Sequence, residues 1–106
     1  MRTNIDAAFA ALADPTRREI LRRVAHGPRR AGDLSRGFRM SRPAVSKHLR
    51  VLREAGLVDA NKQGREQLYR LSPEGLKEVQ GWVEEAGRFW DQALAAFKRY
   101  AEEGDR

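Results

Sequence analysis

Residues 41–58 read SRPAVSKHLRVLREAGLV and predict a short helix followed by the start of a strand. Ser41 suits the N-cap position, and Pro43 is tolerated in the first turn because backbone N–H groups there have no intrahelical partner. Gly56 suits the position just after the last turn. The helix is therefore expected to end before Gly56, and Leu57 and Val58 are expected to lead into a strand.

The two faces of this predicted helix differ in chemistry. Val45, Leu49 and Leu52 recur at i, i+4 and i+7, so they are expected to face a core. The other face carries small, hydroxyl and basic side chains, which suit a helix that lies in the major groove of DNA. Small residues allow close approach, Ser and Arg can bond base edges, and Lys and Arg meet phosphates. The residues on this outer face are Arg42, Ala44, Ser46, Lys47 and Arg50.

Charge is unevenly distributed along the chain. Its 106 residues carry 21 Lys and Arg against 15 Asp and Glu, a formal net charge of +6. Residues 1–72 hold 16 basic and 7 acidic side chains, whereas residues 73–106 hold 5 and 8. The first part is expected to bind a polyanion, with a merely soluble basic surface as the alternative. The chain has no cysteine, no apolar leader and no apolar run of ~20 residues, so a cytoplasmic protein without a membrane partner is expected.

Proline and glycine positions predict a single, mainly α domain, residues 1–106, with a small β-hairpin. Helices are expected over residues 3–12 (capped by Thr3 or Asn4), 15–26 (capped by Asp14), 31–37 (with Leu34 inside), 42–55 and 73–101. Strands are expected over 57–62 and 66–71, joined by a turn at 63–65. In the second helix, Ile20, Leu21, Val24 and Ala25 are expected inside, and Arg17, Arg18, Arg22 and Arg23 in solvent. The order α-α-α-α-β-β-α is a winged helix-turn-helix pattern, with residues 31–56 as the helix-turn-helix and 57–71 as the wing.

Apolar residues recur at threes and fours along residues 73–101 and form one stripe. A helix of nearly thirty residues is ~40 Å long, which exceeds the body that precedes it. The stripe is therefore expected to form a homodimer, with the first helix beside it. The alternative is that this helix covers the core of its own domain. The expected interface residues are Ile5, Phe9, Leu12, Trp82, Phe89, Trp90, Leu94 and Phe97.

Several stretches resemble the ArsR family of bacterial winged-helix repressors. They are residues 11–21 (ALADPTRREIL), 32–34 (GDL), 41–58 and 64–71 (GREQLYRL), and the resemblance extends from about residue 6 to residue 101. Residues 14–17 (DPTR), 45–49 (VSKHL) and 55–58 (AGLV) are specific to this family in combination. The resemblance implies a homodimeric, sequence-specific repressor that occupies a palindromic operator on double-stranded DNA, with two recognition helices in successive major grooves.

The resemblance also implies roles for individual residues. The implied DNA-binding helix residues are Ser41, Arg42, Pro43, Ala44, Ser46, Lys47, His48 and Arg50, of which His48 and Arg50 lie nearer the backbone. His48 could equally hydrogen-bond within the domain. Arg65 lies at the hairpin tip, where family wings reach a minor groove or its phosphates, or it is an ordinary solvated turn residue. Lys62 and Arg70 are expected to flank it as phosphate contacts.

The chain departs from the metal-sensing members of this family. Those members carry Cys-x-Cys in the third helix, where this chain has residues 31–34 (AGDL), or Asp, His and Glu along the last helix. This chain has no histidine after His48, so no metal and no cofactor are expected. Residues 90–100 resemble the ending of a metal-independent subgroup. The aromatic cluster there could line a ligand pocket, although core packing is the simpler interpretation, and no inducer follows from it.

Two other classes of function fit the sequence less well than DNA binding does. An enzyme is not expected because the chain has no cysteine, no glycine-rich phosphate loop and no His–carboxylate pair on adjacent elements. A winged-helix module that binds RNA or a protein is the alternative. RNA readers usually display aromatic side chains for base stacking. Here the aromatic residues concentrate in the last helix, away from most of the basic ones, which favours duplex DNA.

Overall fold

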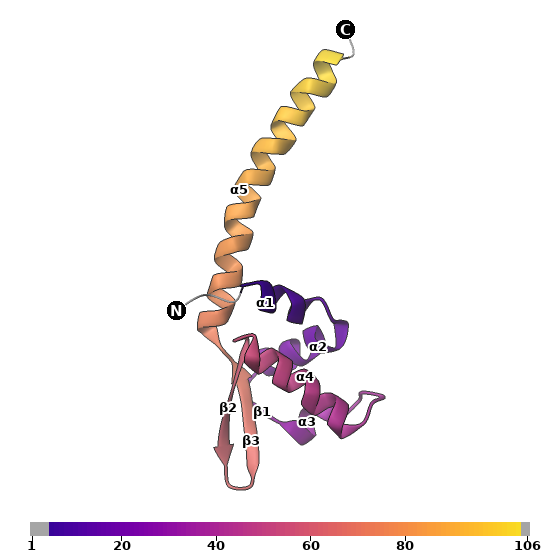
Figure 1. The fold of residues 1–106 in the computed structure, drawn as a ribbon, viewed down its shortest axis with the longest axis vertical. Coiled ribbons are helices and arrows are strands. Elements are labelled where there is room, and N and C mark those ends of the chain that lie inside the picture. Colours follow the sequence, from indigo (N-terminus) through magenta and orange to yellow (C-terminus); the bar gives the residue numbers. More distant parts are fainter. Residues whose placement is uncertain (1–4, 105–106) are drawn as a thin grey trace.

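The computed structural model describes residues 5–104, and within them the chain forms five helices and three strands (Figure 1). The predicted fold class, mainly α with a small β-hairpin, is confirmed. The elements are α1 (Ile5–Leu12), α2 (Pro15–Ala25), β1 (Arg29–Arg30), α3 (Ala31–Ser35), α4 (Arg42–Glu54), β2 (Val58–Gln63), β3 (Glu66–Leu71) and α5 (Pro73–Gly104).

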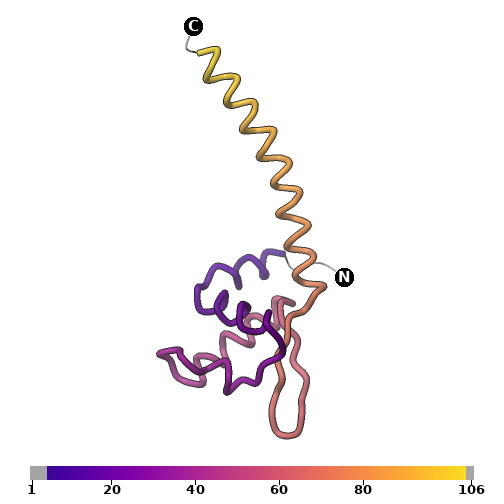
Figure 2. The backbone as a smooth tube through the Cα atoms, turned by 180° about the vertical axis from the view of Figure 1, so that it is seen from behind, coloured from indigo at the N-terminus to yellow at the C-terminus, as the bar shows by residue number. Residues whose placement is uncertain are grey.

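The molecule consists of a small body and a long arm. Helices α1 to α4 and the sheet form the body, and α5 extends away from it in both views (Figures 1 and 2). The molecule measures 70 × 34 × 22 Å, with a radius of gyration of 18.8 Å. A compact chain of this length has a radius of about 13 Å. The arm, at 1.5 Å per residue, is about 48 Å long.

The core lies between the helices of the body and the start of the hairpin. The predicted inward positions Val45, Leu49 and Leu52 of α4 are each no more than 1% exposed, and Leu34 of α3 is fully buried. Burial of a side chain of this size stabilises the fold by about 1.5–3 kcal/mol. Within residues 5–104, no polar or charged residue is buried. The remaining core residues are Ala8, Ala11, Ile20, Leu21, Val24, Leu57 and Val58.

The predicted N-caps of α2 and α4 and the glycine after α4 are confirmed. The Asp14 carboxylate accepts hydrogen bonds from the backbone N–H of Thr16 at 2.8 Å and of Arg17 at 3.1 Å. The Ser41 hydroxyl accepts one from the backbone N–H of Ala44 at 3.3 Å. Gly56 has a φ of +78°, in the left-handed region that ends a helix at low cost.

The sheet has one strand more than the sequence predicted. Its order is β1-β3-β2, all antiparallel, and β1 pairs with β3 through Arg29 opposite Tyr69 and Arg30 opposite Leu68. A two-residue strand has no alternation that a sequence could reveal. The hairpin itself is as predicted, except that β2 begins and ends one residue later, and Gly64 forms the tip with a φ of +64°.

Three further expectations on the helices need correction or lie outside the described residues. Helix α3 ends at Ser35 instead of residue 37, because the backbone of Arg36 is already extended. Ala25 is exposed, since it lies in the last turn of α2, beyond the reach of the core. The caps expected at Thr3 or Asn4 lie outside residues 5–104.

A tight junction joins the end of α4 to the start of α5. The backbone N–H of Leu57 donates to Leu52 O at 3.0 Å, and the N–H of Ser72 donates to Leu57 O at 3.0 Å. Gly75 then lies so close to Gly56 that a β-carbon there would overlap the Gly56 carbonyl. This contact requires glycine at position 75 and sets where α5 leaves the body.

We predict that Gly75→Ala destabilises the protein by about 1–3 kcal/mol, because the added methyl group must displace backbone. Gly81→Ala is the matched control in the same helix: a β-carbon at Gly81 meets nothing within 4 Å. Alanine exceeds glycine in helix propensity by up to about 1 kcal/mol, so the control should be neutral or stabilising. Urea unfolding at one fixed protein concentration measures both. Equal effects of the two substitutions would contradict the close contact.

Candidate nucleic-acid interface

Helix α4 presents the predicted polar residues on the side opposite the core. Six of the eight candidates are exposed: Ser41, Arg42, Pro43, Ser46, Lys47 and Arg50. Ala44 and His48 are half-buried at the edge of this face. The Arg42 guanidinium lies beside α3, since a β-carbon on Gly32 would be 3.5 Å from Arg42 Nη2. The structure thus gathers these candidates on one side of a helix held by its other side.

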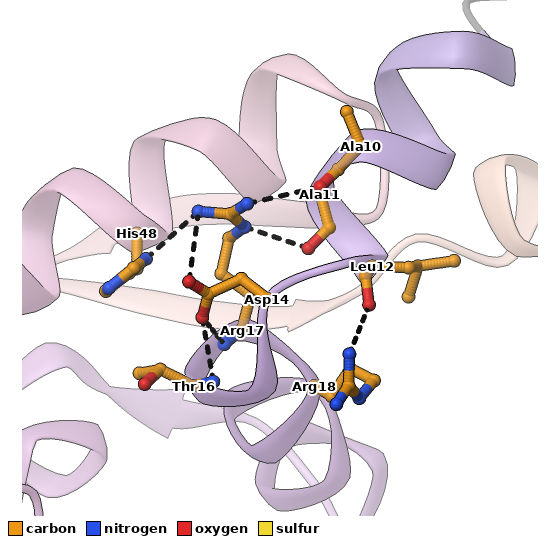
Figure 3. Close-up of polar contacts among 8 residues, drawn as sticks. All are labelled: Ala10, Ala11, Leu12, Asp14, Thr16, Arg17, Arg18 and His48. Atoms are coloured by element: carbon orange, nitrogen blue, oxygen red, sulfur yellow. Dashed lines mark hydrogen bonds and ion pairs between the residues drawn. The ribbon is translucent and has the colours of Figure 1, made fainter.

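His48 of α4 makes a hydrogen bond within the domain. Its Nδ1 lies 3.2 Å from Nη1 of Arg17 on α2 (Figure 3). An arginine guanidinium has donors but no acceptor, so Nδ1 must be the acceptor. The neutral His48 ring therefore carries its proton on Nε2. Of the two roles considered for His48, the bond within the domain is the one present in the structure.

Arg17 was expected in solvent, and this prediction is wrong: its side chain is only 18% exposed. Its Nε donates to Ala11 O at 2.8 Å and its Nη2 to Ala10 O at 3.2 Å, at the end of α1. Its Nη1 reaches both His48 and, at 4.0 Å, the Asp14 carboxylate. Figure 3 shows this single guanidinium between α1, the start of α2 and α4. Arg17 thus ties α4 to α1.

The pKa of the Asp14 carboxyl lies below its ordinary value. The largest cause is the hydrogen bond from the backbone N–H of Arg17, and the N–H of Thr16 and the Arg17 guanidinium add to it. Asp14 is therefore a carboxylate at neutral pH. It can then accept both backbone hydrogen bonds and face the guanidinium.

Arg23 of α2 was also expected in solvent but is largely covered, with 29% of its side chain exposed. Its guanidinium lies 4.2 Å from the centre of the Phe38 ring and donates to Leu34 O at 3.2 Å and Arg36 O at 2.6 Å. It also donates to Glu19, and this bond is the main reason that the pKa of Glu19 lies below its ordinary value. Arg23 thus holds the turn between α3 and α4.

The wing places its three candidate residues at different positions. Arg65 is exposed at the tip beside Gly64, and Lys62 is exposed near the end of β2. Arg70 lies further down the hairpin, opposite Asp59. Lys62 is opposite Gln67, and because side chains alternate along a strand, Arg70 lies on the other face of the sheet from Lys62. Lys62 and Arg65 thus lie at the tip end of the hairpin, whereas Arg70 lies near its base.

Helix α5 leaves its apolar stripe uncovered. Phe9 of α1 packs edge-on against Trp82, with ring centres 5.2 Å apart. The large apolar residues from Trp82 to Tyr100 are nevertheless between 51% and 76% exposed. The chain exposes 8128 Å² in total, whereas a folded monomer of this mass exposes about 6,000 Å². The alternative that α5 covers the core of its own domain is therefore wrong for most of its length.

The described residues offer neither a metal cluster nor a membrane span. No group of three or more His, Cys, Asp or Glu side chains in residues 5–104 is arranged to hold a metal ion. Within the same range, none of the helices combines the length and apolar character needed to cross a bilayer.

A family model described as bacterial regulatory protein, arsR family, matches residues 14–60, from the cap of α2 into β2. The HTH-type transcriptional regulator Rv2034 of Mycobacterium tuberculosis is 45% identical over 101 residues, which cover 94% of this chain and 92% of the relative. This chain belongs to the ArsR family. It is a winged helix-turn-helix, DNA-binding transcriptional regulator.

A further relative and two solved structures agree with this assignment. The transcriptional repressor SdpR of Bacillus subtilis is 35% identical over 75 residues, covering 71% of this chain and 83% of the relative. The solved structure of an ArsR-like transcriptional regulator from Rhodococcus sp. RHA1 aligns with a TM-score of 0.74 and 40% identity, covering 91% of each chain. A homodimeric winged helix-turn-helix domain from Mycobacterium bovis aligns with a TM-score of 0.64 and 27% identity, covering 79% of this chain and 78% of that one.

We predict that Arg17→Met lowers the free energy of unfolding by about 2–3 kcal/mol, because it leaves two α1 carbonyls without a charged donor. Arg18→Met is the matched control, since Arg18 is exposed and, among residues 5–104, donates only to Leu12 O, at 2.9 Å. Its loss should cost less than about 1 kcal/mol. Urea unfolding at one protein concentration compares them. A similar loss of unfolding free energy in both variants would show that the contacts of Arg17 with α1 and α4 do not stabilise the fold.

Proposed function

We propose that this ArsR-family chain is a homodimeric repressor that binds a palindromic operator through α4 and the wing. The observation that carries the proposal is the one-sided burial of α4, which leaves its polar face free over the helix's whole length. Ser46 and Lys47 lie in the middle of that face and are assigned to base edges. Arg50, nearer the end of the helix, is assigned to phosphate.

His48 of α4 and the three wing residues are assigned contacts other than base reading. His48 uses Nδ1 to accept from Arg17, and its protonated Nε2 is then a donor for a DNA phosphate. Arg65 at the wing tip is assigned to the minor groove or its phosphates, with Lys62 beside it. Arg70, opposite Asp59 and on the other face from Lys62, is a weaker candidate.

The dimer interface is assigned to α1 and the apolar stripe of α5. The chain exposes roughly 2,000 Å² more than a compact monomer of its mass would, and a standard interface buries about 800 Å² per partner. The solved structure from Mycobacterium bovis, described as homodimeric, supports this assignment. The proposed interface residues are Ile5, Phe9, Leu12, Trp82, Phe89, Trp90, Leu94 and Phe97.

Repression and independence from metal are both part of the proposal. The relative from Bacillus subtilis is named a repressor, and a dimer seated on a promoter blocks it by occupancy. The chain has no cysteine, and its two histidines are separated, with His26 just after the end of α2 and His48 within α4, which supports the metal-independent subgroup. An open groove of about 290 Å³ lies beside Trp82, Phe89 and Trp90. We assign it to subunit packing.

DNA is preferred to the other classes of partner on the basis of where the aromatic residues lie. The exposed large aromatic side chains are on α5 and not among the basic residues of α4 and the wing. A surface for single-stranded RNA would offer stacking there. An enzymatic role is not proposed, because the relatives named above are regulators.

We predict that Ser46→Ala and Lys47→Ala abolish the preference for the operator while leaving the dimer folded. The operator is first selected from a random-duplex pool, and gel shifts then compare it with a scrambled duplex. Arg65→Ala should instead weaken binding to both duplexes, because a phosphate contact carries no sequence information. Unchanged discrimination in both α4 variants would contradict the assignment of α4 to base reading.

We predict that Trp90→Glu shifts the protein from dimer to monomer at micromolar concentration, because a carboxylate would be buried in an apolar interface. Gln92→Glu is the matched control, since it adds the same charge to the same helix on the side away from the stripe. Sedimentation velocity measures the two states. A monomeric wild type, or a Trp90→Glu dimer as tight as the control, would contradict the interface.

A further inference from the structure

A hollow of about 480 Å³ lies between α3, the first turn of α4 and the wing, beside the surface assigned to DNA. Its wall is formed by three arginines, two carboxylates and two small residues, which come from β1, α3 and the residue after it, α4 and β3. These residues are Arg30, Arg36, Arg42, Asp33, Glu66, Gly32 and Ser35. Arg30, Arg36 and Glu66 were not singled out by the sequence.

The hollow has one guanidinium more than it has carboxylates. Arg30 Nε lies 2.7 Å from Glu66 Oε2, across the sheet from β1 to β3. Arg36 Nη2 lies 4.0 Å from the Asp33 carboxylate, and its side chain is 84% exposed. Among residues 5–104, Arg42 forms no ion pair with an acidic side chain, so the excess positive charge is at the α4 end of the hollow.

Small residues keep this space open. Gly32 has no side chain, and the Arg42 guanidinium lies over it, 3.5 Å from where a β-carbon would be. The Ser35 hydroxyl donates to Ala31 O at 2.8 Å and so adds no free O–H donor to the floor. An anion that enters therefore meets the guanidinium groups of Arg36, just after α3, and Arg42 of α4, each of which can donate two parallel hydrogen bonds to it.

The position of the hollow indicates which anion it meets. With α4 in a major groove and the wing at the adjacent minor groove, the sugar–phosphate strand that separates the two grooves must pass between helix and wing. The hollow is located there. We propose that it binds a backbone phosphate of that strand through Arg36 and Arg42, while Glu66 opposes the phosphate and keeps Arg30 occupied. This inference rests on the proposed function.

The salt dependence of operator binding tests the role of Arg36. Each phosphate contact contributes about −0.9 to the slope of log affinity against log salt concentration, and a dimer has two hollows. Arg36→Gln should therefore make the slope shallower by about 2 and weaken binding roughly tenfold at moderate salt. Arg22→Gln is the matched control, since Arg22 is exposed and paired with Glu19 at 3.2 Å but does not line the hollow.

The opposite result is expected for Glu66→Gln. Removal of this carboxylate frees Arg30 and ends the repulsion of the phosphate, so operator affinity should rise by roughly three- to tenfold at low salt. A merely structural Arg30–Glu66 pair would give the reverse, because its loss would loosen the wing and weaken binding. Fluorescence anisotropy with the selected operator, and circular dichroism to check folding, measure all three variants.

The outcomes distinguish failure of the phosphate site from failure of the proposed function. A wild-type protein that binds no duplex refutes the proposed function itself. A wild type that binds the operator, with Arg36→Gln matching Arg22→Gln in slope, refutes the phosphate site and leaves the proposed function standing. Weaker binding by Glu66→Gln refutes the opposing role of that carboxylate, whereas a shallower slope for Arg36→Gln with tighter binding by Glu66→Gln supports the site in full.

Discussion

The burial of one face of α4 is the constraint on which the rest of the structure depends. Val45, Leu49 and Leu52 leave almost no surface in contact with water, so the helix cannot rotate about its axis without exposing them. The residues on the opposite side are then held outward as a fixed array. Ser41 and Gly56 define where that array begins and ends. The Ser41 hydroxyl accepts a backbone N–H hydrogen bond at the start of the helix, and Gly56 adopts the left-handed conformation that ends it.

Two arginines of α2 hold this helix in place from the polar side. Arg17 bonds His48 in the middle of α4 and two carbonyls of α1, and Arg23 bonds the turn that precedes α4 while its guanidinium lies over Phe38. A guanidinium is suited to both positions because it offers five donors in a plane and stacks on rings. Part of the basic character of this chain therefore serves its own fold, and the charge available to DNA is smaller than composition suggests.

The junction at Gly75 fixes the proposed dimerisation helix relative to the proposed DNA-binding helix. Helix α5 begins against the end of α4 and then leaves the body, so its apolar stripe is presented to a partner and not to its own core. Contacts along α5 would therefore set the separation of two α4 helices in a dimer. Operator half-sites about one helical turn apart, ~34–36 Å, demand such a fixed separation.

The sequence by itself determined whatever depends on neighbouring residues. Caps, helical periodicity and the glycine-tipped hairpin are local, so α2, α4 and β3 were predicted within a residue or two of their observed bounds. Tertiary structure decided the remainder. Strand β1 exists because β3 lies beside it, and the positions of Arg17 and Arg23 depend on carbonyl groups that other segments bring within reach. A long, flexible arginine side chain has no preferred environment of its own, so only the folded chain determines whether it faces solvent, protein or DNA.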